Sequence, residues 1–284
     1  MSSLHLFPVK SLRGSSVQVA EVERLGLRGD RRWMVVDEDG RTLTARKHPE
    51  MLAVTATPAP GGVVLRTAGR EPLVVPEPEG PSDVPVQLSR VGEVTSAGPR
   101  ADGWLSEVLG RAVRLVWLDD PARRPMSAVH GGHPGDPLSL ADTGPLLLTS
   151  TASLRQLDEW VAQGVADAAD GGGAAGGEAP GPLAMERFRP NVVVDGDLEP
   201  FVEDTWARLR IGDVEYRFAE RCDRCVLTTI DPETRRKGPE PLRTLARHRR
   251  EDGKVWFGIR VVPVRAGTIA VGDSVVVPGV PSAR

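Results

Sequence analysis

The run Arg221-Cys-Asp-Arg-Cys-Val-Leu-Thr-Thr-Ile-Asp-Pro232 contains both cysteines of this 284-residue chain, Cys222 and Cys225. It follows a segment with the pattern of a strand, and it ends at a proline that marks a turn. A thiolate is the reactive form of cysteine and a soft metal ligand, and flanking guanidinium groups such as those of Arg221 and Arg224 favour the charged form. We therefore expect this run to hold a metal-bound or reactive sulfur.

The spacing of the two cysteines leaves several interpretations open. The pair is consistent with two buried thiols, with a redox disulfide, or with half of a zinc site. A second pair of cysteines that would complete a four-thiolate zinc site does not occur in the sequence. Two cysteines also cannot form a disulfide framework in a chain that is long enough to bury an ordinary hydrophobic core.

Composition and charge restrict the classes of partner. The formal net charge is −3, and acidic and basic residues are mixed along the chain, so no overall field attracts the protein to nucleic acid or to a membrane surface. The N-terminus lacks the pattern of a secretory signal, and no apolar run approaches the length of a membrane span. We expect a cytoplasmic protein with no membrane span.

The fold is predicted to be mainly β with some helices, an α+β architecture. The 31 glycines and 25 prolines indicate many short turns. Residues 1–118 are expected to form a smaller N-terminal β-barrel-like domain with a short helix at 102–109 capped by Asp102. Its predicted strands include 17–22, 33–36, 42–44, 52–57, 62–66, 72–75, 84–88 and 113–118.

Residues 119–278 are expected to form a second domain, a β barrel with added helices. A capping hydroxyl among residues 149–151 starts the first helix, whose apolar stripe contains Leu154, Leu157 and Val161. The Gly/Ala-rich residues 163–182 are predicted to be a flexible insertion. The other predicted elements are strands at 145–148, 191–194, 209–216, 255–264 and 268–277 and a basic helix at 241–250.

Four separated runs combine polar groups with strand ends or turns, where sites are commonly built. They are Phe7-Pro-Val-Lys-Ser11, Gly29-Asp-Arg-Arg-Trp33, Arg187-Phe-Arg-Pro-Asn191 and the cysteine run. Together with Phe201–Trp206 and Gly267–Asp273, they resemble the MOSC family with its N-terminal β-barrel domain. The resemblance spans nearly the whole chain and is strongest to the amidoxime-reducing branch, which includes the mitochondrial amidoxime-reducing components and bacterial proteins that detoxify N-hydroxylated bases.

The resemblance implies a molybdenum cofactor, molybdenum bound to molybdopterin, with Cys225 as the protein ligand of the metal. A thiolate suits such a metal independently of the family. Cys222 is expected to be a packed neighbour of the site. The resemblance to the family's motifs implies that cofactor-binding residues are Lys10, Ser11, Arg31, Arg189 and Asn191. Further candidates are Ser150, Arg187, Asp223 and Arg224. Cations and hydroxyls of this kind suit a cofactor that carries a phosphate.

The resemblance also implies the reaction, a two-electron reduction of a small N-oxygenated substrate such as an amidoxime. The chain has too few cysteines for its own iron–sulfur cluster and lacks Cys-x-x-Cys-His for haem, so the electrons are expected from a separate ferredoxin, flavin reductase or cytochrome. Two other hypotheses about the function remain open. One is a sulfur carrier with a persulfide on Cys225, and the other is a catalytically silent scaffold.

Some residues depart from the family pattern or have ordinary structural explanations. Relatives often have a glycine where this chain has Arg235, and the family can have a tyrosine near the cofactor where Arg260 stands. The run Arg235-Arg-Lys237 is either a docking patch for an acidic electron donor or an ordinary solvated surface. Trp33 and Trp206 are expected to pack in hydrophobic cores.

Overall fold

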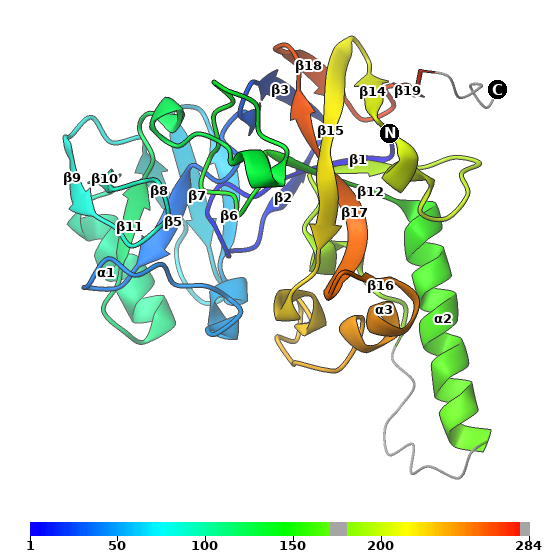
Figure 1. Ribbon diagram of the computed structural model, residues 1–284. Coiled ribbons are helices and arrows are strands. Elements are labelled where there is room, and N and C mark those ends of the chain that lie inside the picture. The colour runs from blue at the N-terminus through cyan, green and yellow to red at the C-terminus, as the bar shows by residue number, and fades with distance from the viewer. Residues whose placement is uncertain (171–180, 279–284) are drawn as a thin grey trace.

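The structure is a computed structural model that describes residues 1–170 and 181–278. Its described residues form four β-sheets, three α-helices and several short 3₁₀ turns. Figure 1 shows two halves side by side, one coloured blue to green and the other mainly yellow to orange. The predicted mainly β fold with some helices is confirmed.

The largest sheet supplies most of the second half. Its two ten-residue strands, β15 (Val214–Asp223) and β17 (Lys254–Pro263), pair antiparallel and leave the cysteine run at the end of β15. All five residues of its central strand β12 (Leu146–Ser150) are buried. The strand order is β19 (Val275–Val276), β14 (Arg208–Ile211), β15, β17, β12, β13 (Val192–Val194), β1 (Ser3–Leu6) and β2 (Ser15–Val17), with β16 (Arg250–Glu251) paired to β17.

The N-terminal residues of the chain belong to the sheets of the second half. Strand β1 pairs with β13, and β3 (Val19–Glu23) pairs with β18 (Gly267–Ala270) and with β4 (Gly26–Leu27). This pairing carries the Phe7–Ser11 run to the junction between the halves. The domain boundary predicted at residue 118 stays a prediction, and residues 1–27 cross it through their strand pairing.

Two smaller sheets build the first half. The predicted hairpin at 52–66 is present, although residues 52 and 53 lie in a 3₁₀ turn and the pairing begins at Thr55. One sheet has the order β5 (Trp33–Val36), β11 (Arg114–Trp117), β10 (Glu93–Ser96) and β9 (Ser82–Pro85), and the other β6 (Thr55–Ala59), β7 (Gly62–Arg66) and β8 (Leu73–Pro76).

Helix α1 (Pro99–Leu109) begins earlier than predicted. Gly98 is its N-cap and Pro99 takes the first helical position, where its missing N–H costs nothing. The prediction that Asp102 caps the helix is therefore wrong. The Asp102 carboxylate instead accepts a 2.8 Å hydrogen bond from the Leu115 amide, which ties α1 to β11.

Helix α2 (Thr151–Asp170) extends further than predicted. The Ser150 hydroxyl accepts from the Ser153 amide at 3.0 Å, which supplies the expected cap. Residues 163–170 are helical where the sequence predicted a flexible insertion, and alanine-rich composition favours this continuation. Residues 171–180 of that predicted insertion lie outside the described residues.

The remaining helical elements are short. Helix α3 (Leu242–His248) covers the end of β17. The 3₁₀ turns are η1 (Pro49–Ala53), η2 (Pro121–Arg123), η3 (Ala128–His130), η4 (Met185–Phe188), η5 (Val202–Thr205) and η6 (Val226–Thr229).

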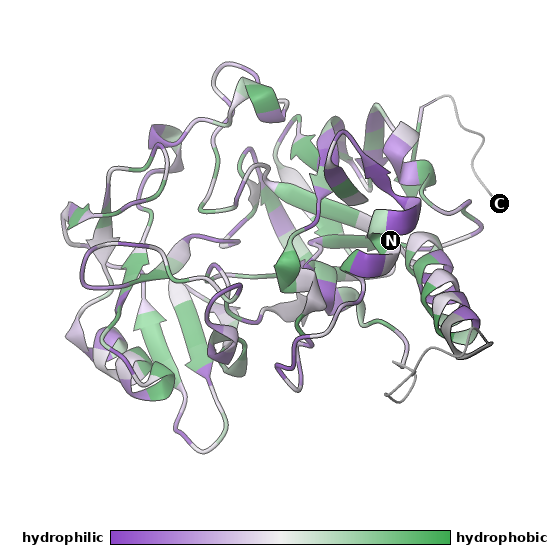
Figure 2. Ribbon diagram, turned by 60° about the horizontal axis from the view of Figure 1, so that its bottom comes forward, coloured by the Kyte–Doolittle hydropathy of each residue, from purple (hydrophilic) through white to green (hydrophobic). Residues whose placement is uncertain are grey.

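Each half has its own hydrophobic core. Trp33 packs in the first with Met51 and Leu105, and Trp206 packs in the second with Tyr216, so the predicted core positions of both tryptophans are confirmed. Figure 2 shows hydrophobic residues concentrated on the strands of both halves. In the described part of the chain, no helix is both long and apolar enough to cross a membrane.

Candidate functional site

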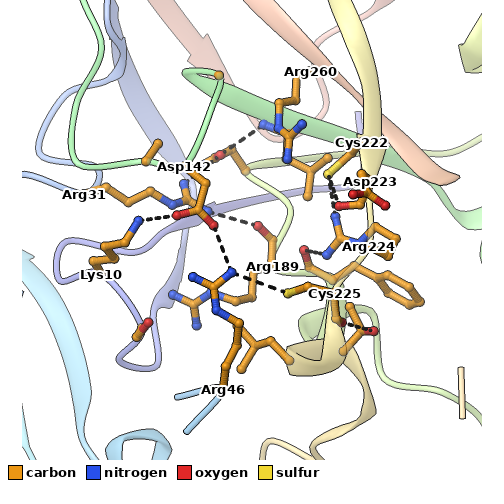
Figure 3. A pocket seen from close by; sticks show the side chains of 18 residues that line it. Lys10, Arg31, Arg46, Asp142, Arg189, Cys222, Asp223, Arg224, Cys225 and Arg260 are labelled. Atoms are coloured by element: carbon orange, nitrogen blue, oxygen red, sulfur yellow. Dashed lines mark hydrogen bonds and ion pairs between the residues drawn. The ribbon is translucent and has the colours of Figure 1, made fainter. Parts of the chain in front are cut away.

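An open cavity of about 800 Å³ lies where the N-terminal runs meet the cysteine run (Figure 3). Its walls come from segments that are far apart in the sequence, including the loop after β1, the loop before β12, and η4. Six cationic side chains line it, against two carboxylates. The cations are Lys10, Arg31, Arg46, Arg189, Arg224 and Arg260, and the carboxylates are Asp142 and Asp223.

Cys225 occupies the open side of this cavity. It is the N-cap residue of η6, its backbone is extended, and its side chain is exposed. The Arg46 guanidinium, from the first half, approaches the Cys225 sulfur to 4.0 Å (Nη1 to Sγ). Arg221 turns away, pairing with Glu251 at 2.5 Å and stacking over Trp256. The cation beside this thiol is therefore Arg46. The expectation of a flanking guanidinium was wrong for Arg221, whereas Arg224 contacts the other sulfur, that of Cys222.

Cys222 lies deeper in the same cavity and is buried, as expected for a packed neighbour. Arg224 Nη1 donates to the Cys222 sulfur at 2.8 Å, and Nη2 donates to the Phe188 carbonyl at 2.7 Å. The Nε of Arg224 is buried and has no partner among the described residues. Arg224 thus ties Cys222 to η4 and keeps one donor without a partner among the described residues.

Asp142 holds two of the cations. Lys10, which is buried, forms an ion pair with it and donates to the Leu140 carbonyl at 2.8 Å, and Arg46 lies 3.9 Å from its other oxygen. Burial by itself raises the pKa of Asp142, but Lys10, Arg46 and Arg260 outweigh that effect and hold the pKa well below its usual range. The Asp142 carboxylate is therefore ionised at neutral pH.

Arg31 and Asn191 cross-link the strands beneath the cavity. Arg31 Nη1 donates to Asn191 Oδ1 at 3.0 Å, and the same oxygen accepts from the Leu147 amide at 3.2 Å. Asn191 Nδ2 donates to the His5 carbonyl at 3.2 Å. One fully buried amide therefore joins β1, β12 and an arginine of the site.

Arg189 carries a charge that the described residues leave without a hydrogen-bond partner. Its guanidinium stacks on Phe7 at 4.3 Å from the ring centre. Burial, and secondarily the charge of Arg31, lower the pKa of Arg189 to about 9. Both Arg31 and Arg189 also have left-handed backbones, with φ of 50° and 56°, which side-chain-bearing residues rarely adopt. Such strain is retained where the surroundings require a particular direction of the side chain.

Arg260 enters the cavity from β17. Its Nη1 donates to Glu220 Oε1 at 2.6 Å, and Glu220 in turn binds Thr143 at 2.8 Å and His130 at 2.9 Å. Its aliphatic stem packs over Gly144, where a Cβ would lie 2.7 Å from Arg260 Cδ. A glycine at this position therefore provides the space in which Arg260 lies.

Comparison with known proteins identifies the family. Residues 1–112 match the family model described as the MOSC N-terminal beta barrel domain, and residues 129–276 match that of the MOSC domain. The chain belongs to the MOSC family. The resemblance predicted from the sequence is thereby confirmed.

Several relatives align over nearly the whole chain. Mitochondrial amidoxime-reducing component 1 of Homo sapiens is 33% identical over 98% of this chain and 83% of that protein. Mitochondrial amidoxime reducing component 2 of Rattus norvegicus is 34% identical over 97% of this chain and 82% of its own length. Molybdenum cofactor sulfurase of Danio rerio is 32% identical over 91% of this chain but only 31% of that protein.

The cavity of this MOSC protein contains most of the residues predicted from the sequence. Two predicted residues do not line it. Ser150 is buried against Glu203 and Ser153, and Arg187 pairs with Asp231 at 2.6 Å beside an adjoining cavity of about 700 Å³. Those that do line it are Lys10, Ser11, Arg31, Arg189, Asn191, Asp223, Arg224 and Cys225.

Three charged residues of the cavity, Arg46, Asp142 and Arg260, were not among the predicted site residues. Arg46 and Asp142 carried a usable signal, because each is a charged residue close to a predicted strand end, where sites are commonly built. Arg260 stands where the family can have a tyrosine near the cofactor, but no role was predicted for it, and its direction into the cavity depends on Gly144 and Glu220.

The donor set of the cavity fits the molybdenum cofactor that the resemblance implies. Excess cationic charge, the unpaired guanidinium of Arg189 and the unused Arg224 Nε suit the phosphate and the polar edge of a pterin. The Arg46 guanidinium, which contacts the Cys225 sulfur, cannot ligate a metal, and the described residues contain no group of three or more His, Cys, Asp or Glu side chains that could hold one. A metal on this sulfur would therefore bring other ligands with it, as a dithiolene-bound metal does.

Proposed function

We propose that this protein is a molybdenum-cofactor-dependent reductase of N-oxygenated compounds, with Cys225 as the metal ligand. The observation that carries the proposal is an exposed thiol opening into a cavity lined by six cations from distant segments. The names of the human and rat relatives, which align over nearly the whole chain, support the reaction class.

Different residues of the cavity would bind different parts of the cofactor. Arg189 and Arg224 have donors that find no partner among residues 1–170 and 181–278, so they would bind the cofactor phosphate and pterin, with Lys10, Ser11, Arg31 and Asn191 around them. When bound, the molybdenum cofactor supplies two-electron redox chemistry at the metal. The Cys225 thiolate would fix the metal at the open side of the cavity, where a substrate can reach it.

Reduction of an N-hydroxy group also consumes protons. Asp223 lines the cavity and is exposed, whereas Asp231 accepts from the Thr234 amide at 2.7 Å and pairs with Arg187 outside it. Asp142 is kept ionised by its cations. Of Asp223 and Asp231, only Asp223 lines this cavity, where its Oδ1 also accepts from the Val255 amide at 3.2 Å, and we propose that it passes protons to the substrate.

The test is metal content combined with turnover. We expect the protein, produced with molybdate available, to contain about one molybdenum and one pterin per chain. With methyl viologen reduced by dithionite, it should convert benzamidoxime to benzamidine. A protein that loads molybdenum but leaves benzamidoxime unreduced would overturn the substrate class, and one that stays free of molybdenum and pterin would overturn the whole proposal.

A second candidate function is sulfur transfer by a persulfide on Cys225. The exposed thiol beside Arg46 and the similarity to a molybdenum cofactor sulfurase favour it. Labile sulfane sulfur in a metal-free protein, lost in Cys225→Ala, would support this function. Stoichiometric molybdenum with pterin would support the reductase.

The electron donor and the location of the protein remain part of this proposal. We propose a separate ferredoxin, flavin reductase or cytochrome as the donor, and the cytoplasm as the location. The human and rat relatives are named as mitochondrial proteins, and that location is stated for those proteins only.

A further inference from the structure

An exposed basic loop follows the segment that carries Cys225. This basic loop, residues 231–240, contains Arg235, Arg236 and Lys237, and all three are exposed. Within residues 1–170 and 181–278, their side chains form no ion pair or hydrogen bond. Most arginines of the cavity, by contrast, bind a carboxylate or a backbone carbonyl.

The basic loop is held firmly against the segment that carries Cys225. Its first residue, Asp231, accepts from the Glu233 amide at 3.0 Å and from the Thr234 amide at 2.7 Å. Gly238 donates to the Thr229 carbonyl at 3.0 Å, which fixes the loop to η6. Figure 1 shows this segment in gold between β15 and α3, at the lower edge of the molecule. Its three cations therefore project from a loop that is hydrogen-bonded to η6, and Leu227 and Thr228 of η6 line the cavity.

The backbone of Arg235 is left-handed. Its φ is 58°, in the left-handed region that glycine adopts freely and arginine does not. Arg31 and Arg189, also left-handed, direct their side chains into the cavity. Arg235 has the same strained backbone, yet its side chain makes no contact of this kind with the described protein. Its charge is therefore available to a partner outside the chain.

We propose that Arg235, Arg236 and Lys237 form the docking surface for a small acidic electron-transfer protein. The inference rests on the proposed reductase function, since that reaction needs electrons from outside. Conversion of an N-hydroxy group to N–H and water takes two electrons and two protons, so a one-electron donor must dock twice per turnover. The chain as a whole is negatively charged, at −3, so an acidic partner needs a local positive surface to approach.

The experiment uses the cofactor-loaded protein with benzamidoxime as substrate and a reduced plant-type [2Fe–2S] ferredoxin as the acidic probe. The variant R235Q/R236Q/K237Q removes the surface. The control R28Q/R208Q/R265Q removes three exposed cations next to β3, β14 and β18, at the opposite end of the molecule in Figure 1. Each protein is also assayed with dithionite-reduced methyl viologen, a small donor that needs no docking surface.

We expect kcat/KM for ferredoxin to fall about 10-fold in the loop variant at low ionic strength, because charge complementarity sets the rate of encounter. The difference should shrink to about 2-fold or less at high salt. The control variant, the methyl viologen rate and the Tm should stay unchanged.

Three outcomes would overturn the inference. In the first, the loop variant reacts with ferredoxin as fast as the wild type does, and both turn over with methyl viologen. That result would disprove the docking surface but not the proposed reductase function. An equal loss in the control variant shows a general charge effect. Loss of binding to phosphatidylserine vesicles, with the ferredoxin rate unchanged, would assign the surface to a membrane instead. If the wild-type protein does not reduce benzamidoxime even with methyl viologen, the proposed function itself is wrong.

Discussion

The two walls of the cavity hold their charged groups in different ways. On the ligand wall, formed by Cys222, Arg224 and Cys225, the guanidinium is fixed to a backbone carbonyl and to a buried sulfur. On the charge wall, formed by Lys10, Arg46 and Asp142, two cations share one carboxylate that faces the cavity. The ligand wall therefore has a geometry set by the backbone, whereas the charge wall depends on a balance of side-chain charges.

The largest effect should come from the ligand wall. Cys225→Ser should lose its molybdenum and at least about 100-fold in activity, since even neighbours of metal ligands cost 10–100-fold when replaced. Cys222→Ser is the matched control, because a hydroxyl can still accept from Arg224, and it should keep its metal. Molybdenum content and benzamidoxime reduction measure both. Equal loss of metal in the two variants would show that the sulfurs are not distinct in role.

The next effect concerns the amide that joins the walls from beneath. Asn191→Ala removes the partners of the buried Leu147 amide and of the partly buried His5 carbonyl, and it frees Arg31. Because an unsatisfied buried polar group costs about 1–3 kcal/mol, the free energy of unfolding should fall by about 2–4 kcal/mol.

Urea denaturation measures that loss. Asn191→Asp serves as the comparison, since it keeps the acceptor for Arg31 and for the Leu147 amide, while it replaces the donor to the His5 carbonyl by an oxygen whose negative charge lies beside Arg31. It should lose less stability than Asn191→Ala. A stability of Asn191→Ala equal to that of the wild type would contradict the view that this side chain ties the walls together.

The ion pairs of the charge wall should make the free energy of unfolding depend on pH. The folded-state pKa of Asp142 is lowered from its ordinary value of 3.8, so its contribution to stability is complete above that pH and is lost as the pH falls further. Asp142→Asn lacks this contribution. The difference in unfolding free energy between wild type and variant should therefore be greatest near about pH 5 and shrink toward about pH 3. A difference that stays constant over this range would mean that the carboxylate does not stabilise its cations.

The sequence predicted the ligand wall better than the charge wall, and the physical reason lies in their construction. Cys225, Arg224 and Asp223 are neighbours in one run, so their proximity follows from the chain itself. Arg46 and Asp142 meet only because the two halves pack together, and no local pattern encodes that contact. Lys10 was predicted only from the family resemblance, because its motif matches one that contributes to cofactor binding in the family.

The fold was predictable to a similar extent. Strand positions followed from alternation and turn residues, as the hairpin of β6 and β7 shows. The cap of α1 was mispredicted because a carboxylate near a helix start has two possible partners, and tertiary structure gave Asp102 the Leu115 amide. Likewise, the pairing of β1 with β13 joins residues nearly two hundred positions apart, which sequence periodicity does not report.

The smallest effect tests whether space, as well as charge, shapes the cavity. Gly144 has no left-handed strain, but an added Cβ would lie 2.7 Å from Arg260 Cδ and 3.1 Å from its Cβ. Gly144→Ala should displace the Arg260 stem and weaken its 2.6 Å hydrogen bond to Glu220. We expect kcat/KM to fall about 3- to 10-fold, because small displacements at a reacting site cost rate. Stability should change little, since the stem of an arginine can move.

Gly103→Ala is the control for that substitution. Gly103 lies within α1, where an added Cβ meets nothing within 4 Å, so alanine should stabilise the helix by about 0.5–1 kcal/mol and leave activity unchanged. The contrast separates crowding in the cavity from any general effect of replacing glycine. If Gly144→Ala kept full activity while Arg260→Gln lost it, the charge of Arg260 would matter but its packing over Gly144 would not, and the balance of charges alone would define the site.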